Sequence, residues 1–166
     1  MANPKTLVAY YSLSGTTRSL AQQLASTLQA DLEEIVPVRR QRRGFMTYSR
    51  MAWAAFTRAS MPVQPPAHAI GNYDLVVVGG PVWVGRVASP VRAWLKANAL
   101  APSTRFAAFV TLSGSSPEAS LAELDQLAGR AATARLAIAD RDRKARRDTD
   151  QVADFVRKLS PLRLAA

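Results

Sequence analysis

The sequence predicts a three-layer α/β sandwich, in which helices cover both faces of a five-stranded parallel sheet. Short apolar strands alternate with amphipathic helical segments along the chain, and no internal repeat is present. Strands that are joined through helices pair in parallel, with right-handed crossovers. A length of 166 residues suits one domain. We therefore expect residues 1–166 to form a single unit of this class.

The first half of the chain predicts three strands and one helix. Residues 6–11 and 73–78 are apolar runs rich in strand-forming residues, and the second run stops at Gly79-Gly80-Pro81. Residues 31–36 alternate between polar and apolar side chains and end before a proline. Residues 18–30 form the helix. Its apolar stripe has a spacing of four and consists of Leu20, Leu24 and Leu28.

The second half of the chain predicts the remaining elements. Strands are expected at residues 104–112 and 133–140, and helices at residues 89–98, from 117 onward, and around 152–159. The helix after the first of these strands is expected to begin with Ser116 as its N-cap and Pro117 in its first position. Residues 38–70 form an irregular segment, although the alternation of strands and helices along the chain predicts the second helix there.

The residue types exclude several kinds of chemistry. Without cysteine, the chain has no disulfides, thiolate metal sites or cysteine nucleophiles. His68 is the only histidine, so a histidine metal cluster cannot form within one chain, and a Ser-His-Asp triad would depend on this residue alone. We therefore expect no metal and no catalytic side chain, and we expect a bound cofactor to supply the chemistry.

The net charge of +10 favours anionic partners. These include acidic proteins, phosphorylated small molecules, nucleic acids and a membrane surface. The alanine- and arginine-rich composition that a GC-rich genome encodes explains the same charge. The first six residues lead directly into a short strand instead of a signal-peptide core, and no apolar run reaches the about 18 residues that a membrane span needs. The sequence is therefore that expected of a cytoplasmic protein without a transmembrane segment.

Three polar or glycine-containing loops follow the first, third and fourth predicted strands, at residues 12–17, 79–86 and 113–116. The carboxyl ends of parallel strands share one edge of a sheet, so these loops are expected to lie together. The first loop places hydroxyls, a glycine and a helix start around one point, which suits a phosphate group. A plain Ser/Thr N-cap with a turn glycine explains the same residues. The chain contains neither a dinucleotide-binding fingerprint nor a P-loop.

In these loops the chain resembles the flavodoxin family. The residues that match the family's phosphate loop, T/S-x-T-G-x-T, are Ser12, Ser14, Gly15 and Thr17. Thr16 stands where members usually carry Asn. Residues 80–85 are similar to the second flavin-contacting loop of flavodoxin-like reductases, and residues 113–115 are similar to the third. The resemblance covers nearly the whole chain and implies a flavodoxin-like strand order of 2-1-3-4-5 with bound FMN.

The resemblance also implies which residues contact FMN. Those expected at the phosphate are Ser12, Ser14, Gly15, Thr16 and Thr17. Those expected at the ring are Pro81, Val82, Trp83, Val84 and Gly85 in the second loop, and Ser113, Gly114 and Ser115 in the third. Trp83 either stacks on the ring or packs in the core against Trp94, which we expect to be a core residue.

Two features depart from the acidic, short-looped pattern of the family. Arginine-rich clusters at residues 39–43 and 141–147 either form a positive field on both sides of the flavin edge or belong to solvated loops that contain Asp142 and Asp148. Residues 45–61 are basic and amphipathic. They form either the second helix that covers the sheet or a segment that binds a membrane or a partner, and an aromatic from them is a candidate cap for the flavin.

The functional expectation is an FMN-binding electron-transfer protein. It acts as a redox carrier or as a small NAD(P)H-dependent FMN reductase of quinone-type acceptors, and the sequence does not separate these roles. The expected partners are a redox protein of acidic character or NAD(P)H. The alternative is a basic module that binds nucleic acid or a protein partner on a flavodoxin scaffold without flavin. No stacking platform or RNA motif supports that alternative.

Overall fold

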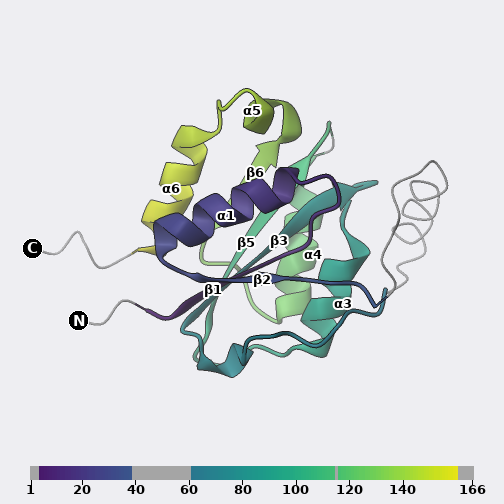
Figure 1. The fold of residues 1–166 in the computed structure, drawn as a ribbon, viewed down its shortest axis with the longest axis vertical. Helices are drawn as coiled ribbons and strands as arrows, with labels where there is room; N and C mark the ends of the chain where they lie inside the picture. Colours follow the sequence, from purple (N-terminus) through teal and green to yellow (C-terminus); the bar gives the residue numbers. More distant parts are fainter. Residues whose placement is uncertain (1–3, 39–60, 115, 161–166) are drawn as a thin grey trace, which may run out of the picture.

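The computed structural model describes residues 4–38, 61–114 and 116–160. Within these residues, strands and helices follow one another along the chain (Figure 1). The strands are β1 (Thr6–Tyr10), β2 (Asp31–Glu34), β3 (Leu75–Trp83), β4 (Arg86–Val87), β5 (Arg105–Leu112) and β6 (Arg135–Ala139). The helices are α1 (Thr16–Leu28), the short 3-10 helix η1 (Ile70–Asn72), α3 (Ser89–Ala97), α4 (Glu118–Ala128), α5 (Asp140–Lys144) and α6 (Thr149–Leu159).

The sheet has the strand order β2-β1-β3-β5-β6, and every neighbouring pair on this path is parallel. The register aligns Val8 of β1 with Val77 of β3, and Val77 with Ala107 of β5. The two-residue strand β4 pairs only with the end of β3, in antiparallel orientation. When β4 is set aside, the order is 2-1-3-4-5, which confirms the predicted fold class and topology.

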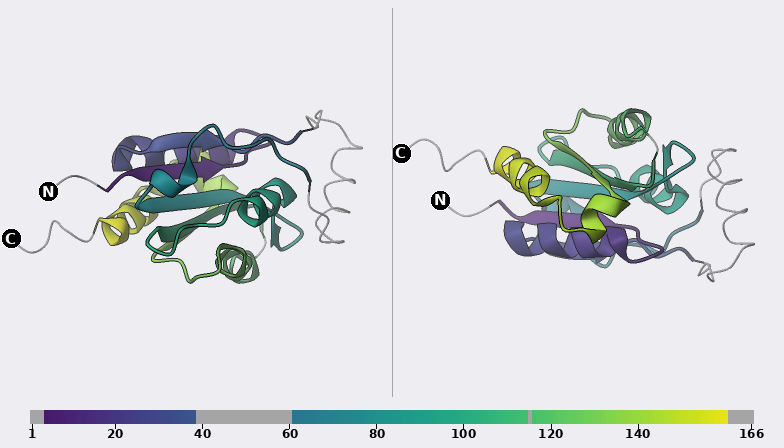
Figure 2. Two further views of the ribbon diagram at one scale, coloured as in Figure 1. Left: turned by 90° about the horizontal axis from the view of Figure 1, so that it is seen from below. Right: turned by 90° about the horizontal axis from the view of Figure 1, so that it is seen from above.

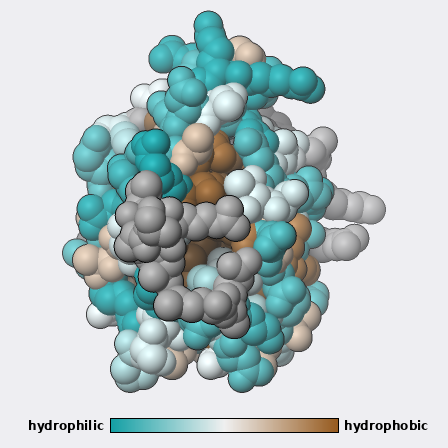
Figure 3. Space-filling view, turned by 90° about the vertical axis from the view of Figure 1, so that its left-hand side faces the viewer, coloured by the Kyte–Doolittle hydropathy of each residue, from teal (hydrophilic) through white to brown (hydrophobic). Residues whose placement is uncertain are grey.

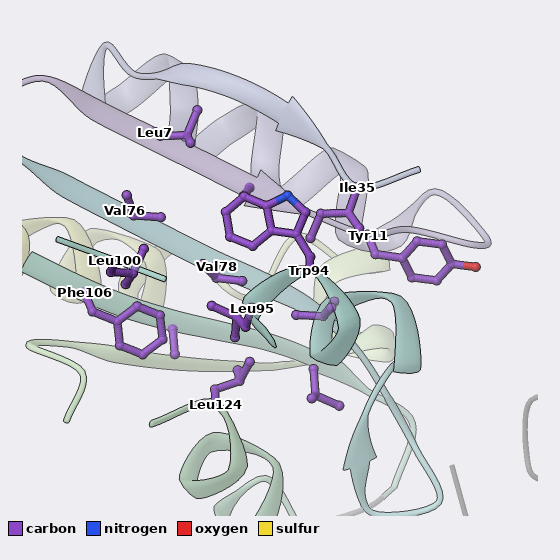
Figure 4. Packing of buried hydrophobic residues seen from close by; sticks show 14 of the residues in the cluster. Leu7, Tyr11, Ile35, Val76, Val78, Trp94, Leu95, Leu100, Phe106 and Leu124 are labelled. Atoms are coloured by element: carbon purple, nitrogen blue, oxygen red, sulfur yellow. The ribbon is translucent and has the colours of Figure 1, made fainter. Parts of the chain in front are cut away.

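Helices lie on both faces of the sheet (Figure 2), and alternate residues of the central strands face opposite layers. Val8 and Val77 pack beneath α1 and α6, whereas their neighbours Leu7 and Val76 pack beneath α3 and α4. Trp94 of α3 is 1% exposed and packs in the same hydrophobic cluster as Leu7 and Val76, which confirms that it is a core residue (Figure 4). The sheet is therefore covered on both faces, as a parallel sheet requires.

Strand β3 is longer than the sequence predicted. The expected break at Gly79-Gly80-Pro81 is wrong, because the strand continues through these residues to Trp83. A Cβ atom at residue 79 would lie 2.4 Å from the ring of Phe109, and one at residue 80 would lie 2.6 Å from Val91 Cγ2. The two glycines therefore allow β5 and α3 to pack directly against the strand, and they do not end it.

Three element boundaries also differ from expectation. Helix α1 begins at Thr16 and not at residue 18, directly after Gly15 in the left-handed region at φ 101°. The expected N-cap role of Ser116 is wrong. Pro117 occupies the cap position of α4, and the Ser116 hydroxyl donates to the carboxylate of Glu118 instead. The last strand ends one residue early, and the short helix α5 follows it without a sequence signal.

The two described ends of the irregular region lie side by side. Pro37 and Val63 form an antiparallel bridge, and the N–H of Val38 donates to the carbonyl of Pro62 over 2.9 Å. His68 bonds the buried carboxylate of Glu33, so the only histidine of the chain anchors this segment to β2. The predictions for residues 39–43 and 45–61 fall outside the described residues, apart from Met61.

Among the described residues, the exposed large hydrophobic side chains are Val38 and Val84. Figure 3 views the molecule from the end at which β1 begins and α6 ends, where hydrophobic residues show between hydrophilic ones. At this end, Arg105 of β5 donates to the carbonyl of Leu159 over 3.3 Å. No helix among the described residues is both long enough and apolar enough to cross a membrane.

Gly79→Ala tests the close approach of β3 to β5. We expect it to lower the free energy of unfolding by roughly 1–3 kcal/mol, because the new methyl group overlaps the Phe109 ring. Urea unfolding measures the change. Gly71→Ala is the matched control, since its Cβ meets no atom within 4 Å, and we expect a change within about 0.5 kcal/mol. Equal stability of both variants would contradict this packing.

Candidate functional site

The loops that follow β1, β3 and β5 lie at one edge of the sheet, because these three strands are adjacent and parallel (Figure 1). Two hydrogen bonds tie the first loop to its neighbours. The N–H of Tyr11 donates to the carbonyl of Gly79 over 3.1 Å, and the hydroxyls of Thr17 and Thr111 are 2.7 Å apart. The predicted convergence of the three loops on the carboxyl edge is therefore present in the structure.

The first loop leads into α1 through a turn closed by a side chain. The hydroxyl of Ser12 accepts the N–H of Gly15 over 3.1 Å, and the hydroxyls of Ser14 and Thr16 are 3.5 Å apart. Gly15 is the N-cap, and no side chain caps the helix. The plain Ser/Thr cap that the sequence left open is thus not formed.

The start of α1 presents backbone donors to the loop. The first intrahelical bond runs from Ser19 N to Gly15 O over 3.0 Å, so the N–H groups of residues 16–18 have no partner within the helix. The first turn contains no acidic residue. Such a helix start favours an anion through its N–H groups and its dipole. Thr17 itself is buried, and its hydroxyl joins α1 to β5.

The second of the three glycine-containing loops is a β-hairpin, and no sequence signal indicated its pairing. Trp83 pairs with Arg86, and the two residues between them, Val84 and Gly85, have φ values of 51° and 74°. Positive φ at both positions is the pattern of a type I′ turn. Val84 is a β-branched residue in a region that such residues avoid, and it is 66% exposed.

Glu123 of α4 holds this hairpin in place. Its carboxylate accepts the N–H of Val87 over 3.2 Å and bonds the guanidinium of Arg86 over 3.1 Å. The N–H of Ala88 also donates to the carbonyl of Pro81 over 2.9 Å. No sequence signal indicates Glu123, because its partners lie more than thirty residues earlier in the chain.

Trp83 packs edge-to-face against Tyr11, with 5.7 Å between the ring centroids and 88° between the planes. Figure 4 shows the Tyr11 ring directed away from Trp94. Trp83 is only partly buried, so part of its ring is accessible at the loop edge. Burial, with a smaller effect of Glu34, raises the pKa of the Tyr11 phenol to about 12. Tyr11 is therefore neutral over the physiological pH range.

The third loop is exposed at its described residues. The hydroxyl of Ser113 donates to the carboxylate of Asp140 at the start of α5, and Gly114 has a φ of 93°. Ser115 lies outside the described residues. Asp140 is a further residue of this edge that the sequence did not indicate, because its contact depends on how β5 and β6 pair.

Several basic residues near this edge are already ion-paired. Arg18 bonds Glu34 over 2.6 Å and the Tyr10 hydroxyl over 3.3 Å, which raises the pKa of its guanidinium. In the second cluster, Arg143 pairs with Asp148 over 2.8 Å and Arg147 pairs with Asp142 over 3.4 Å. These pairs favour the interpretation of that cluster as partly neutralised surface. Among the described residues, no group of three potential ligands is placed to hold a metal.

The fold and this loop edge define a class of α/β proteins that bind ligands at the carboxyl ends of their strands. The chain belongs to the flavodoxin family, because the sequence profile described as Flavodoxin matches residues 5–134. No curated protein matches the chain at a significant level.

Several solved structures share this fold. A flavoprotein of Lactobacillus acidophilus in complex with FMN is 25% identical, with a TM-score of 0.68 over 90% of this chain and 99% of the other. A candidate flavoprotein of Bacteroides uniformis, 18% identical, superposes with a TM-score of 0.75 over 94% and 99% of the two chains. A short-chain flavodoxin associated with a bacterial microcompartment is 14% identical, with a TM-score of 0.54 over 95% and 97%.

Val84→Asn tests the strained turn. We expect it to stabilise the protein by roughly 1 kcal/mol, because asparagine tolerates the left-handed conformation better than valine. Thermal unfolding measures the change. Val38→Asn is the matched control, since this valine is also exposed, at 60%, but has no positive φ. A loss of stability in Val84→Asn equal to that of the control would show that the turn is not strained.

Tyr11→Phe tests the environment of the phenol. The pKa of Tyr11 is about 12 in the folded state and about 10 in the unfolded state. The neutral phenol therefore makes its full contribution to the free energy of unfolding at pH values below the unfolded-state pKa. It is lost as the pH rises through the higher value, by up to about 3 kcal/mol. We expect the wild type to lose this much more stability than Tyr11→Phe between neutral and strongly alkaline pH, as measured by urea unfolding. Parallel losses in both proteins would contradict the raised pKa.

Proposed function

We propose that the protein binds FMN at the loop edge and transfers electrons through it. The observation that carries this proposal is the convergence of the three loops beside the start of α1, where the N–H groups of residues 16–18 have no partner within the helix and the first turn has no acidic residue. Membership of the flavodoxin family and the similarity to a flavoprotein in complex with FMN support it. When bound, FMN supplies one- or two-electron transfer.

The donor set at the start of α1 fits the phosphate of FMN. The loop offers backbone N–H groups and hydroxyls, and a helix N-terminus favours a negative charge. Arg143, Lys144 and Arg146 line the same depression as Gly15 and Thr16, and they add positive charge beside the helix start. Gly15 has no side chain, and a Cβ there would meet nothing within 4 Å, so the space beside the cap is open. We assign the phosphate to Ser12, Ser14, Gly15, Thr16 and Thr17.

The hairpin and the third loop fit the flavin ring. The hairpin presents backbone groups of residues 81–85 in a conformation fixed by Glu123, and hydrogen bonds from such groups tune the reduction potential of a flavin. Trp83 contributes a partly accessible aromatic surface beside them. We assign the ring to Pro81, Val82, Trp83, Val84 and Gly85, together with Ser113, Gly114 and Ser115.

The role as carrier or as reductase depends on the electron donor. We propose an acidic redox protein or NAD(P)H, because the chain has a net charge of +10. Adding NADPH to the FMN-loaded protein separates the two roles. Loss of the flavin absorbance with NADPH alone indicates a reductase, whereas reduction only by a redox protein indicates a carrier. The ion pairs of Arg143 and Arg147 do not favour the nucleic-acid alternative.

Gly15→Ala tests the phosphate assignment. Alanine disfavours the φ of 101° at this position, so we expect the loop to shift and FMN affinity to fall by about tenfold or more. Fluorescence titration with FMN and with riboflavin, which lacks the phosphate, measures both affinities. The loss should be confined to FMN.

The matched control is Gly129→Ala, at the end of α4. Gly129 also has a positive φ, 69°, and open space around its Cβ, but it lies in none of the three loops. We expect a similar loss of stability and unchanged FMN affinity. Equal affinities of the wild type for FMN and riboflavin would refute the phosphate assignment, and absence of flavin binding would refute the proposed function.

A further inference from the structure

The depression that contains Gly15 and Thr16 has a volume of about 420 Å³ and extends beyond the assigned phosphate site. Ser19 and Gln23 line it further along α1, since helix residues three or four apart share a face. The opposite wall is formed by the end of α5, the turn after it and the start of α6. The residues of this wall are Arg143, Lys144, Arg146, Asp148 and Thr149. We call this space the α1–α5 groove.

Arg143 fixes the wall of the α1–α5 groove. Its side chain is 14% exposed, and its guanidinium donates to the carboxylate of Asp148 over 2.8 Å and to the carbonyl of Ser19 over 2.9 Å. It also donates to the hydroxyl of Ser19 and to the side-chain oxygen of Gln23. Asp148, the acidic residue that lines the groove, is itself buried. The charges of Arg143 and Asp148 therefore compensate each other, and their contacts hold α5 against α1.

Lys144 and Arg146 carry the positive charge of the groove that this pair does not compensate. Both residues are exposed. All twelve acidic side chains of the chain belong to the described residues, and none of them lies at ion-pair distance from Lys144 or Arg146. The α1–α5 groove therefore has a net positive charge, and two of its cations are available to an anionic ligand.

Arg146 also has an unusual backbone conformation. Its φ of 55° lies in the left-handed region, in a turn that the N–H of Arg147 closes by donating to the carbonyl of Asp142 over 2.8 Å. Glycine and asparagine adopt this conformation at lower cost than arginine. Strained residues of this kind cluster at ligand sites. The strain therefore points to a role for the Arg146 side chain in the groove.

The groove suits a phosphate group that carries a polar organic group. Lysine and arginine bind phosphates through charge-assisted hydrogen bonds. The volume of the groove is typical of small-molecule sites, and a single phosphate group fills only a small part of it. Gln23 and Thr149 offer an amide and a hydroxyl that can hydrogen-bond a nucleoside. A ligand with a second phosphate and a nucleoside therefore fits the space next to the assigned phosphate site.

We propose that the α1–α5 groove binds the adenylate half of FAD, so that the flavin site accepts FAD as well as FMN. This inference rests on the proposed function, because the first phosphate of FAD takes the place of the FMN phosphate at the start of α1. Lys144 and Arg146 contact the second phosphate. Gln23 and Thr149 contact the adenosine.

Isothermal titration calorimetry of the flavin-free protein with FMN and with FAD tests the proposal. We expect the wild type to bind FAD at least as tightly as FMN. Lys144→Gln should lower the affinity for FAD about threefold or more and the affinity for FMN by a smaller factor, because it removes a contact with the second phosphate. Arg141→Gln is the matched control, since it removes the same charge from α5 at a position that does not line the groove. It should leave the ratio of the two affinities unchanged.

Arg146→Asn separates the role of the side chain from that of the backbone. Asparagine relieves the left-handed conformation, so we expect a higher midpoint of thermal unfolding, together with a fall of about threefold or more in the affinity for FAD. A loss of stability with unchanged affinity for FAD would contradict the role of Arg146.

The outcomes distinguish this inference from the proposed function. Binding of FAD tenfold or more weaker than binding of FMN would overturn the inference and leave the proposed function in place. Equal changes of the affinity ratio in Lys144→Gln and Arg141→Gln would also overturn the inference alone. Absence of binding of both flavins would overturn the inference and the proposed function together.

Discussion

The close contact of β3 with Phe109 and Val91 is the constraint on which the loop edge depends. Side chains at positions 79 and 80 would overlap these residues, so two glycines are required there. Without a break at this point, β3 continues beyond Tyr10, the last residue of β1, and carries the hairpin to the carboxyl edge. The packing of the core thus decides where the second loop stands relative to the first.

Contacts between the elements then fix the three loops relative to one another. Tyr11 joins the first loop to β3 through its N–H and to the hairpin through its ring, and Thr17 joins α1 to the end of β5. Glu123 fixes the hairpin from α4, which is the helix that follows the third loop. Each of the three loops is therefore held by contacts with a neighbouring element of the fold.

The sequence was sufficient for the fold class and the convergence of the loops, because hydrophobic periodicity and the loop motifs are local signals. The strand order followed from the resemblance to the flavodoxin family. The sequence did not predict features that depend on contacts between residues far apart in the chain. Gly79-Gly80-Pro81 has the composition of a strand end, yet Phe109, thirty residues later, makes it part of a strand. Glu123 and Asp140 carried no motif, since their partners become neighbours only when the sheet forms. Ser116 does not act as the N-cap of α4, because its hydroxyl donates to the carboxylate of Glu118 instead.

The central claim is that neutral backbone donors at the start of α1 hold the phosphate of FMN while the hairpin faces its ring. A crystal structure of the protein grown with FMN tests this claim most directly. The account predicts phosphate oxygens within hydrogen-bond distance of the N–H groups of residues 16–18, and the flavin ring beside Trp83. A phosphate bound instead by the cations of residues 141–147, or a ring remote from the hairpin, would contradict it.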